Sequence, residues 1–184
     1  MAQTNSMASI NLGFLTVQQE TNGYVGGFLV TNSWGRPLEF RMSSAVQPNR
    51  IQQILHGGTL HGYICADVIG KALVDKTTAP TRVILTDKEA ALDLRLNCGA
   101  PIAWLASAGD PMAEDLAEDG ALVRPASGKC GPILCHPRFP EDAAKIRELL
   151  AVIDGSIDLA EPLSRIREAL KEARKMGVAH RAAA

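Results

Sequence analysis

The chain has 184 residues, of which 46% are hydrophobic and 21% are charged, a composition typical of a folded globular protein. Its 19 basic and 20 acidic residues leave a net charge of −1, and only 4% of its residues are aromatic, so neither charge nor stacking side chains indicate a nucleic-acid partner. No apolar run approaches the roughly 20 residues that cross a bilayer. The segment Met1–Ser9 lacks the basic and apolar regions of a secretory signal. Four cysteines without a dense framework favour free thiols, and we expect a soluble cytoplasmic protein.

Three segments near the N-terminus have the pattern of consecutive antiparallel strands. Alternating residues predict strands over Leu12–Gln19, Tyr24–Thr31 and Leu38–Ser43. The first two are joined through Asn22–Gly23, a pair typical of tight hairpins because both residues accept positive φ. Gly26 and Gly27 lie inside the second strand, where they predict a bulge or a close backbone approach.

Helical spacing follows this meander. Pro48 is expected in the first turn of a short helix with an apolar stripe of Ile51, Ile54 and Leu55. The run His56-Gly57-Gly58-Thr59 is expected to interrupt it, with Thr59 as the N-cap of a second helix that ends at Lys76.

The pattern then returns to strand. Arg82–Leu85 reads as a buried strand, and Thr86 or Asp87 is the expected N-cap of a helix that runs to about Asn97. The apolar run Pro101–Ser107 is expected to pair beside it as a parallel strand. After an acidic helix over Met112–Glu118, the sequence predicts short strands at 121–124 and 131–135.

Two amphipathic helices are predicted at the C-terminus. The first begins at Pro140-Glu141-Asp142, and Asp158 is the expected cap of the second. A heptad-like apolar stripe runs along the second helix and reads as a surface for packing in cis or for a protein partner; it comprises Leu159, Leu163, Ile166 and Leu170. The expected organisation is a flexible leader (1–11), an α/β domain (12–139), a C-terminal helical hairpin (140–177) and a flexible tail (178–184).

This order of elements resembles the ribonuclease H-like fold: an antiparallel meander, a helix, a strand that ends in Asp, a helix and a parallel strand. Gly26-Gly27, Gly35, Ser44-Ala45, Asn49-Arg50 and Thr86-Asp87 stand where that superfamily places small and polar residues. The resemblance covers about Leu12 to Ser107 and implies a mixed α/β (α+β) sheet.

The resemblance also implies two Mg²⁺ ions held by clustered carboxylates. An acid is expected on the first strand, where Thr16 and Gln18 stand, with Glu20 only beyond its end. Another is expected on the first helix, which offers Gln52 and Gln53. Only Asp87 matches, and Asp110, Glu114 or Asp115 could supply a late acid. The nuclease site is therefore expected to be incomplete, and Asp87 is a weak catalytic candidate beside its role as a helix cap.

Two other groups of residues could bind ligands. Cys130, Cys135 and His136 form the densest set of zinc-type ligands, and Cys65, Cys98, His56 or His61 would have to supply a fourth. The run His56 to Thr59 could leave N–H groups free for an anion, although it lacks the Lys-Ser/Thr ending of a phosphate loop. Buried thiols and a plain break between helices are the alternatives.

Three functions follow from these patterns. The first is a non-catalytic interaction or assembly subunit that binds protein partners through its C-terminal helices and needs no cofactor. The second is a metal-dependent phosphodiester hydrolase with Mg²⁺ or Zn²⁺. The third is a small-ligand or nucleotide-binding domain.

Overall fold

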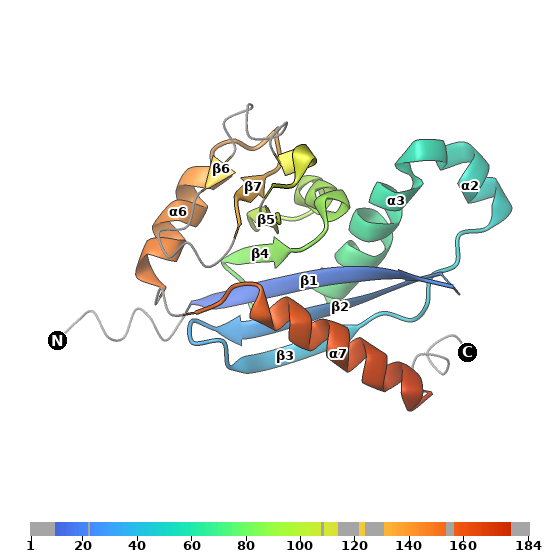
Figure 1. Cartoon of the computed structure of the whole chain (residues 1–184), viewed down its shortest axis with the longest axis horizontal. Coiled ribbons are helices and arrows are strands. Elements are labelled where there is room, and N and C mark those ends of the chain that lie inside the picture. The colour runs from blue at the N-terminus through green and yellow to red at the C-terminus, as the bar shows by residue number, and fades with distance from the viewer. Residues whose placement is uncertain are drawn as a thin grey trace.

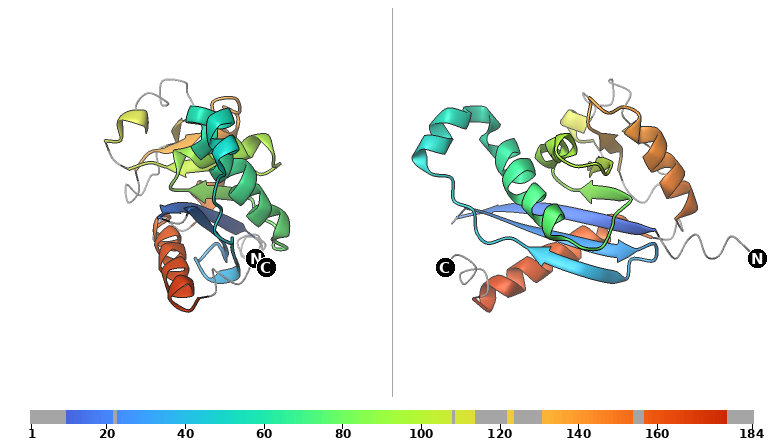
Figure 2. Two further views of the ribbon diagram at one scale, coloured as in Figure 1. Left: turned by 90° about the vertical axis from the view of Figure 1, so that its right-hand side faces the viewer. Right: turned by 180° about the vertical axis from the view of Figure 1, so that it is seen from behind.

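The computed structural model describes residues 10–21, 23–107, 109–113, 122–123, 131–153 and 157–177. The sheet in this part of the chain has seven strands in the order β3-β2-β1-β4-β5-β7-β6. Helices cover both of its faces, as the views in Figures 1 and 2 show. This mixed sheet confirms the predicted α/β class, and its first five strands follow the predicted order of an antiparallel meander and then two parallel strands.

The predicted meander forms three of the seven strands. Its strands are β1 (Asn11–Glu20), β2 (Gly23–Asn32) and β3 (Pro37–Met42), which pair antiparallel in sequence order. Residue 22 of the predicted Asn-Gly turn lies outside the described residues. Gly23 has a positive φ of 117°, but it is the first residue of β2 and pairs with Glu20.

The rest of the sheet begins with two parallel strands. β4 (Val83–Thr86) lies beside β1, and β5 (Ile102–Leu105) lies beside β4, as the sequence predicted. β7 (Ile133–Cys135) then pairs antiparallel with β5, and β6 (Leu122–Val123) with β7. Both ends of the predicted strand at 121–124 lie outside the described residues, as does 114–118 of the acidic helix.

A continuous helical track leads onto one face of the sheet. Its successive segments are α2 (Arg50–His56), the 3₁₀ turn η1 (Gly57–Thr59), α3 (Leu60–Tyr63), the π-helical η2 (Ile64–Gly70) and α4 (Lys71–Lys76). Two sequence predictions need correction here. Pro48 lies before α2 instead of in its first turn, and Asn49 is the N-cap, through a capping box with Gln52. Thr59 stands at the predicted N-cap position of α3, but its side chain makes no capping hydrogen bond, because its hydroxyl donates to the His56 carbonyl.

The segment after β4 also differs from its prediction. It is the 3₁₀ helix η3 (Glu89–Leu96) rather than an α-helix, and neither Thr86 nor Asp87 caps it. The N-cap is Lys88, whose N–H donates to the hydroxyl of Thr86 at 3.1 Å. Asp87 is therefore free of the capping role and bonds to another part of the chain.

The opposite face carries α6 (Asp142–Val152) and α7 (Glu161–Lys175). α6 packs against β6 and β7, whereas α7 crosses β1 and β2 (Figure 1). The two C-terminal helices are thus spread over the sheet instead of forming a hairpin that stands apart from the domain. Helix α7 follows a turn in which Asp158 Oδ1 accepts from the Ala160 N–H, so Asp158 acts three residues before the helix begins. Within the described residues, no helix is both long and apolar enough for a membrane span.

Gly26 and Gly27 explain how closely the helices approach the sheet. A Cβ on Gly26 would lie 2.3 Å from Ile69 Cγ2 of η2, and one on Gly27 would lie 2.4 Å from Ile166 Cγ2 of α7. Because neighbouring residues of a strand face opposite ways, the two glycines let one helix approach from each side. The predicted close backbone approach is confirmed twice.

Candidate functional site

The candidate site lies where β2, β1 and β4 pass beneath α7. The pairs Thr16↔Gly27 and Leu15↔Thr86 place Thr16 between Gly27 on one side and Asp87, the next residue after β4, on the other. Thr16 has the same parity in its strand as Phe14, which belongs to the core beneath α6 and α7. A glycine, a threonine and an aspartate therefore form a row across three strands, on the face that α7 covers.

Arg167 of α7 reaches into this row. Its Nη1 donates to Asp87 Oδ2 at 2.5 Å, and its Nη2 donates to Ser164 Oγ at 2.8 Å, which fixes the plane of the guanidinium. The side chain of Asp87 is only 20% exposed, so water screens this ion pair less than it would a surface pair. Asp87 is held as a salt-bridge partner of the last helix.

Two oxygens of the row have no hydrogen-bond partner among the described residues. Thr16 Oγ1 and Asp87 Oδ1 are both buried, and Thr16 is completely inaccessible. A buried polar group without a partner costs about 1–3 kcal/mol, so a water molecule or a bound donor between these strands would be stabilised here. Two polar oxygens therefore lie in the core without a hydrogen-bond donor among the described residues.

A shallow pocket of about 380 Å³ continues from the row along β1 and α7. Glu20, at the end of β1, pairs with Arg174 at 2.9 Å. The pocket mixes both signs of charge; its lining residues are Gln18, Glu20, Arg167, Glu168, Lys171 and Arg174. Asp87 and Glu20, the acids of the β4 and β1 ends, are thus each neutralised by an arginine of α7.

These residues do not fit the Mg²⁺ ions that the fold resemblance implies. Among the described residues, no group of three or more His, Cys, Asp or Glu side chains could hold a metal ion. Asp110 accepts from the Met112 N–H within its own turn, and Glu114 and Asp115 lie outside the described residues. Gln52 and Gln53 lie on α2, which projects away from the sheet (Figure 1).

The residues predicted as zinc ligands also form no metal site among the described residues. Cys130 lies outside the described residues. Cys135 is buried in the core beneath α6, and burial raises the pKa of its thiol to about 12. His136 Nδ1 accepts from the Arg138 N–H at 3.1 Å, so its Nε2 carries the proton and faces Asp93 Oδ1 at 3.1 Å. His136 is occupied by these two contacts.

The other predicted sites change as well. The run His56 to Thr59 is not an open anion loop, because it lies within the helical track and the Gly57 N–H donates to the Gln53 carbonyl. In place of a partner interface, the apolar stripe of α7 packs into the chain's own core; Leu159, Leu163, Ile166 and Leu170 are only 1–6% exposed. A partner could reach this stripe only if α7 left the sheet.

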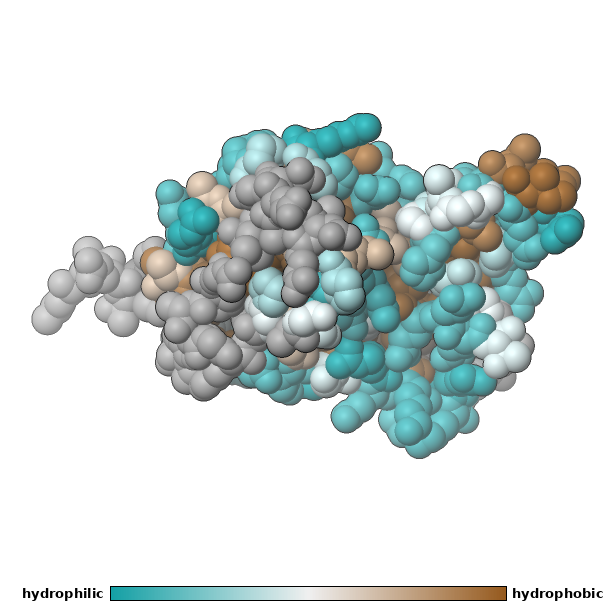
Figure 3. Space-filling view, turned by 45° about the horizontal axis from the view of Figure 1, so that its top comes forward, coloured by the Kyte–Doolittle hydropathy of each residue, from teal (hydrophilic) through white to brown (hydrophobic). Residues whose placement is uncertain are grey.

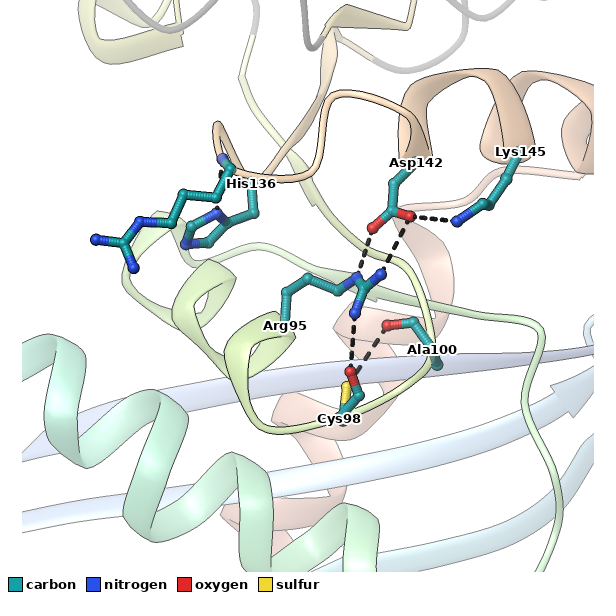
Figure 4. Close-up of polar contacts among 7 residues, drawn as sticks. Arg95, Cys98, Ala100, His136, Asp142 and Lys145 are labelled. Carbon is teal, nitrogen blue, oxygen red and sulfur yellow. Dashed lines mark hydrogen bonds and ion pairs between the residues drawn. The ribbon is translucent and has the colours of Figure 1, made fainter.

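A second ion network joins η3 to α6 (Figure 4). The carboxylate of Asp142 is completely buried and accepts from Arg95 Nε at 2.6 Å and from Lys145 Nζ at 3.0 Å. Arg95 also donates to the Cys98 carbonyl and lies 4.1 Å from the centre of the Phe139 ring. Asp142 was predicted as a helix-start acid, and its buried role depends on the distant Arg95.

Arg167 is the site residue that sequence reasoning missed. In the sequence it belongs to a helix face of alternating basic and acidic residues, which reads as a solvated surface. The only local indication that Arg167 lies near the sheet is its position directly after the apolar Ile166, and this position does not predict that its partner is Asp87.

Comparisons with known proteins identify no family. No protein-family model matches the chain, and no curated protein matches it. Among solved structures it is similar to Endonuclease V of Ciona intestinalis, crystallised with a 23mer DNA that contains an inosine followed by a ribo-adenosine. That match has a TM-score of 0.48 and 13% sequence identity, and it covers 90% of this chain and 86% of that one. At this level of likeness, neither a substrate nor a catalytic residue carries over to this chain.

Proposed function

We propose that this chain is a non-catalytic assembly subunit, in which a ribonuclease H-like sheet is the scaffold and α2 docks another protein. The observation that carries the proposal is the Asp87–Arg167 pair beside Thr16. Two-metal hydrolysis needs several carboxylates around two divalent cations. Here one carboxylate is already neutralised by a guanidinium, and a neutral hydroxyl occupies the first strand.

Helix α2 has the properties of a docking element. It stands away from the sheet and has no buried residue. Ile51, Ile54 and Leu55 are 67%, 65% and 78% exposed, and they form a hydrophobic patch at one end of the molecule (Figure 3). Their spacing of i, i+3 and i+4 is that of a helix that binds in an apolar groove.

The helix is also formed before any partner binds. The Asn49–Gln52 capping box fixes its start, and Gly57, with a φ of 51°, ends it. The stretch 45–66 contains no Asp or Glu and includes Arg50. We therefore propose a protein partner with an apolar groove and an acidic rim.

The scaffold role is tested by an assay for hidden nuclease activity. Labelled single- and double-stranded DNA and RNA are incubated with the chain and with Arg167→Ala, in the presence of Mg²⁺ or Mn²⁺. We expect no cleavage by either protein, because releasing Asp87 still leaves one carboxylate. Metal-dependent cleavage that Asp87→Asn abolishes would contradict the proposal.

Co-purification tests the docking role. The proteins that purify with the native chain are compared with those that purify with a variant that carries both Ile54→Glu and Leu55→Glu. Because both side chains are exposed, the variant should keep its melting temperature and lose the bound protein. Met176→Glu is the matched control, since Met176 is also exposed (77%) but follows α7. Loss of the partner from both variants, or from neither, would contradict docking through α2.

One observation favours a second function, that of a metal-dependent phosphodiester hydrolase. Thr16 Oγ1 and Asp87 Oδ1 are buried without partners in the described part of the chain, and a phosphate group could attract the Arg167 guanidinium away from Asp87. The free carboxylate could then bind a cation beside the Thr16 hydroxyl. This function predicts that Mn²⁺ binds only when an oligonucleotide is present, which calorimetry can measure with Asp87→Asn as the control.

A further inference from the structure

Strand β3 is an edge of the sheet with an unusual composition. In the described part of the chain it pairs with β2 and with no other strand. Leu38 and Phe40 are 51% and 40% exposed, and they alternate with the charged Glu39 and Arg41. Pro37 and the register shift at Val30/Thr31 lie at the start of β3, so the regular edge comprises Glu39–Met42.

Backbone groups along this edge point outward. The Ser43 N–H donates to the Gly26 carbonyl at 2.9 Å, and the Gly26 N–H donates to the Ser43 hydroxyl at 2.9 Å, so the two residues form a hydrogen-bonded pair in which one acceptor is a side chain. Because such pairs alternate along an antiparallel ladder, Arg41 faces β2, whereas the N–H and C=O groups of Phe40 and Met42 face away from the sheet. They are available to another strand.

The apolar and the charged side chains of β3 lie on opposite faces of the sheet. Phe40 lies on the α7 face, since a Cβ at Gly27 would meet both Phe40 Cε2 and Ile166. Glu39 lies on the other face, where its carboxylate accepts from the Thr78 and Ala79 N–H groups and from Arg41. Arg41 remains 44% exposed at its side chain.

This arrangement is complementary to itself. If two copies of β3 pair antiparallel with Phe40 opposite Phe40, each Glu39 stands opposite the Arg41 of the other copy. Leu38 and Met42 then meet across the pair, on the same side as the two Phe40 rings. Opposite charges and aromatic pairs directly across an antiparallel ladder both stabilise it.

We infer that two copies of this chain associate through their β3 edges about a two-fold axis, which joins their sheets into one. The occupant of the edge is a second copy, because Glu39 and Arg41 of one β3 lie opposite Arg41 and Glu39 of an antiparallel second β3. The contact is separate from α2 and from the proposed partner groove. Because a short strand buries less than the roughly 800 Å² per partner of a stable interface, the association is weak and depends on concentration.

Sedimentation of the full chain over a range of concentrations tests this inference. The weight-average mass should rise from 19.6 kDa toward twice that value. Arg41→Glu and Glu39→Arg should each stay monomeric, because like charges then meet twice across the axis. An equimolar mixture of the two variants should associate again, since every Glu then faces an Arg.

Ile54→Glu is the control, because it changes an equally apolar surface on α2 and should leave the self-association unchanged. Should Glu39→Arg fail to fold, a photoreactive benzoyl-phenylalanine at position 40 replaces the mixture experiment. It should cross-link to a peptide from positions 38–42 of the other copy. A chain that stays monomeric at all concentrations, or a dimer that survives Arg41→Glu and cross-links elsewhere, would overturn the inference.

Discussion

Removal of the Asp142 carboxylate should be one of the most destabilising polar substitutions in the described part of the chain. Asp142→Ala removes an acceptor that is completely buried and leaves Arg95, whose side chain is 12% exposed, with the Cys98 carbonyl as its remaining hydrogen-bond partner. Breaking a buried ion pair on one side costs about 3–5 kcal/mol. We expect the lower end, about 3 kcal/mol, because Lys145 is 55% exposed and returns to water.

For a chain of this size, a loss of about 3 kcal/mol lowers the melting temperature by roughly 6–12 °C. Thermal unfolding by circular dichroism and urea titration measure the change, and Lys145→Ala is the control, with an expected loss of about 0.2–1 kcal/mol. A loss for Asp142→Ala no larger than that of Lys145→Ala would refute the reasoning. It would mean that Arg95 reaches water or another acceptor without cost.

The same carboxylate makes stability depend on pH. Burial acts to raise the pKa of Asp142, but the hydrogen bonds from Arg95 and Lys145 outweigh it and hold the pKa below its ordinary value of 3.8. A depressed pKa stabilises the fold above the pKa of the unfolded chain, and this contribution is lost as the pH falls below it. The difference in unfolding free energy between the native protein and Asp142→Ala should therefore shrink below about pH 4.

Further substitutions test the other contacts. Gly27→Ala should destabilise the protein, and Ile166→Ala in the same chain should recover part of the loss, because the added Cβ would lie 2.4 Å from Ile166 Cγ2; urea titration of the double-mutant cycle measures the coupling. The backbone N–H of Ala79, with Arg41 and Thr78, lowers the pKa of Glu39 from 4.5 to about 2, so the advantage of the native chain over Glu39→Gln should disappear as the pH falls from about 4.5 to 2. Burial raises the pKa of the Cys65 and Cys135 thiols to about 11 and about 12, so at pH 8 both should react with a thiol reagent only after denaturation; rapid labelling of either in the folded protein would show that its site opens.

Local patterns in the sequence determined the meander and the class of fold. Strand alternation and an Asn-Gly turn act over a few residues, so β1, β2 and β3 could be placed to within one or two positions. The buried strand Val83–Thr86 and its parallel neighbour were equally evident, because each is a short apolar run bounded by turn residues. Amphipathic spacing likewise predicted that α7 has one apolar face.

Only the tertiary structure decided what those faces touch. The stripe on α7 was consistent with packing in cis or with a partner. Because Gly27 has no side chain, α7 can lie directly on the chain's own sheet. Asp87 was predicted as a helix cap because that prediction uses only its neighbours in the sequence. Its partner, Arg167, is 80 residues further along the chain. Asp142 and Arg95 are likewise joined across 47 residues. A sequence pattern reports periodicity and local hydrogen bonds, but the pairing of charges depends on which strands and helices the fold brings together.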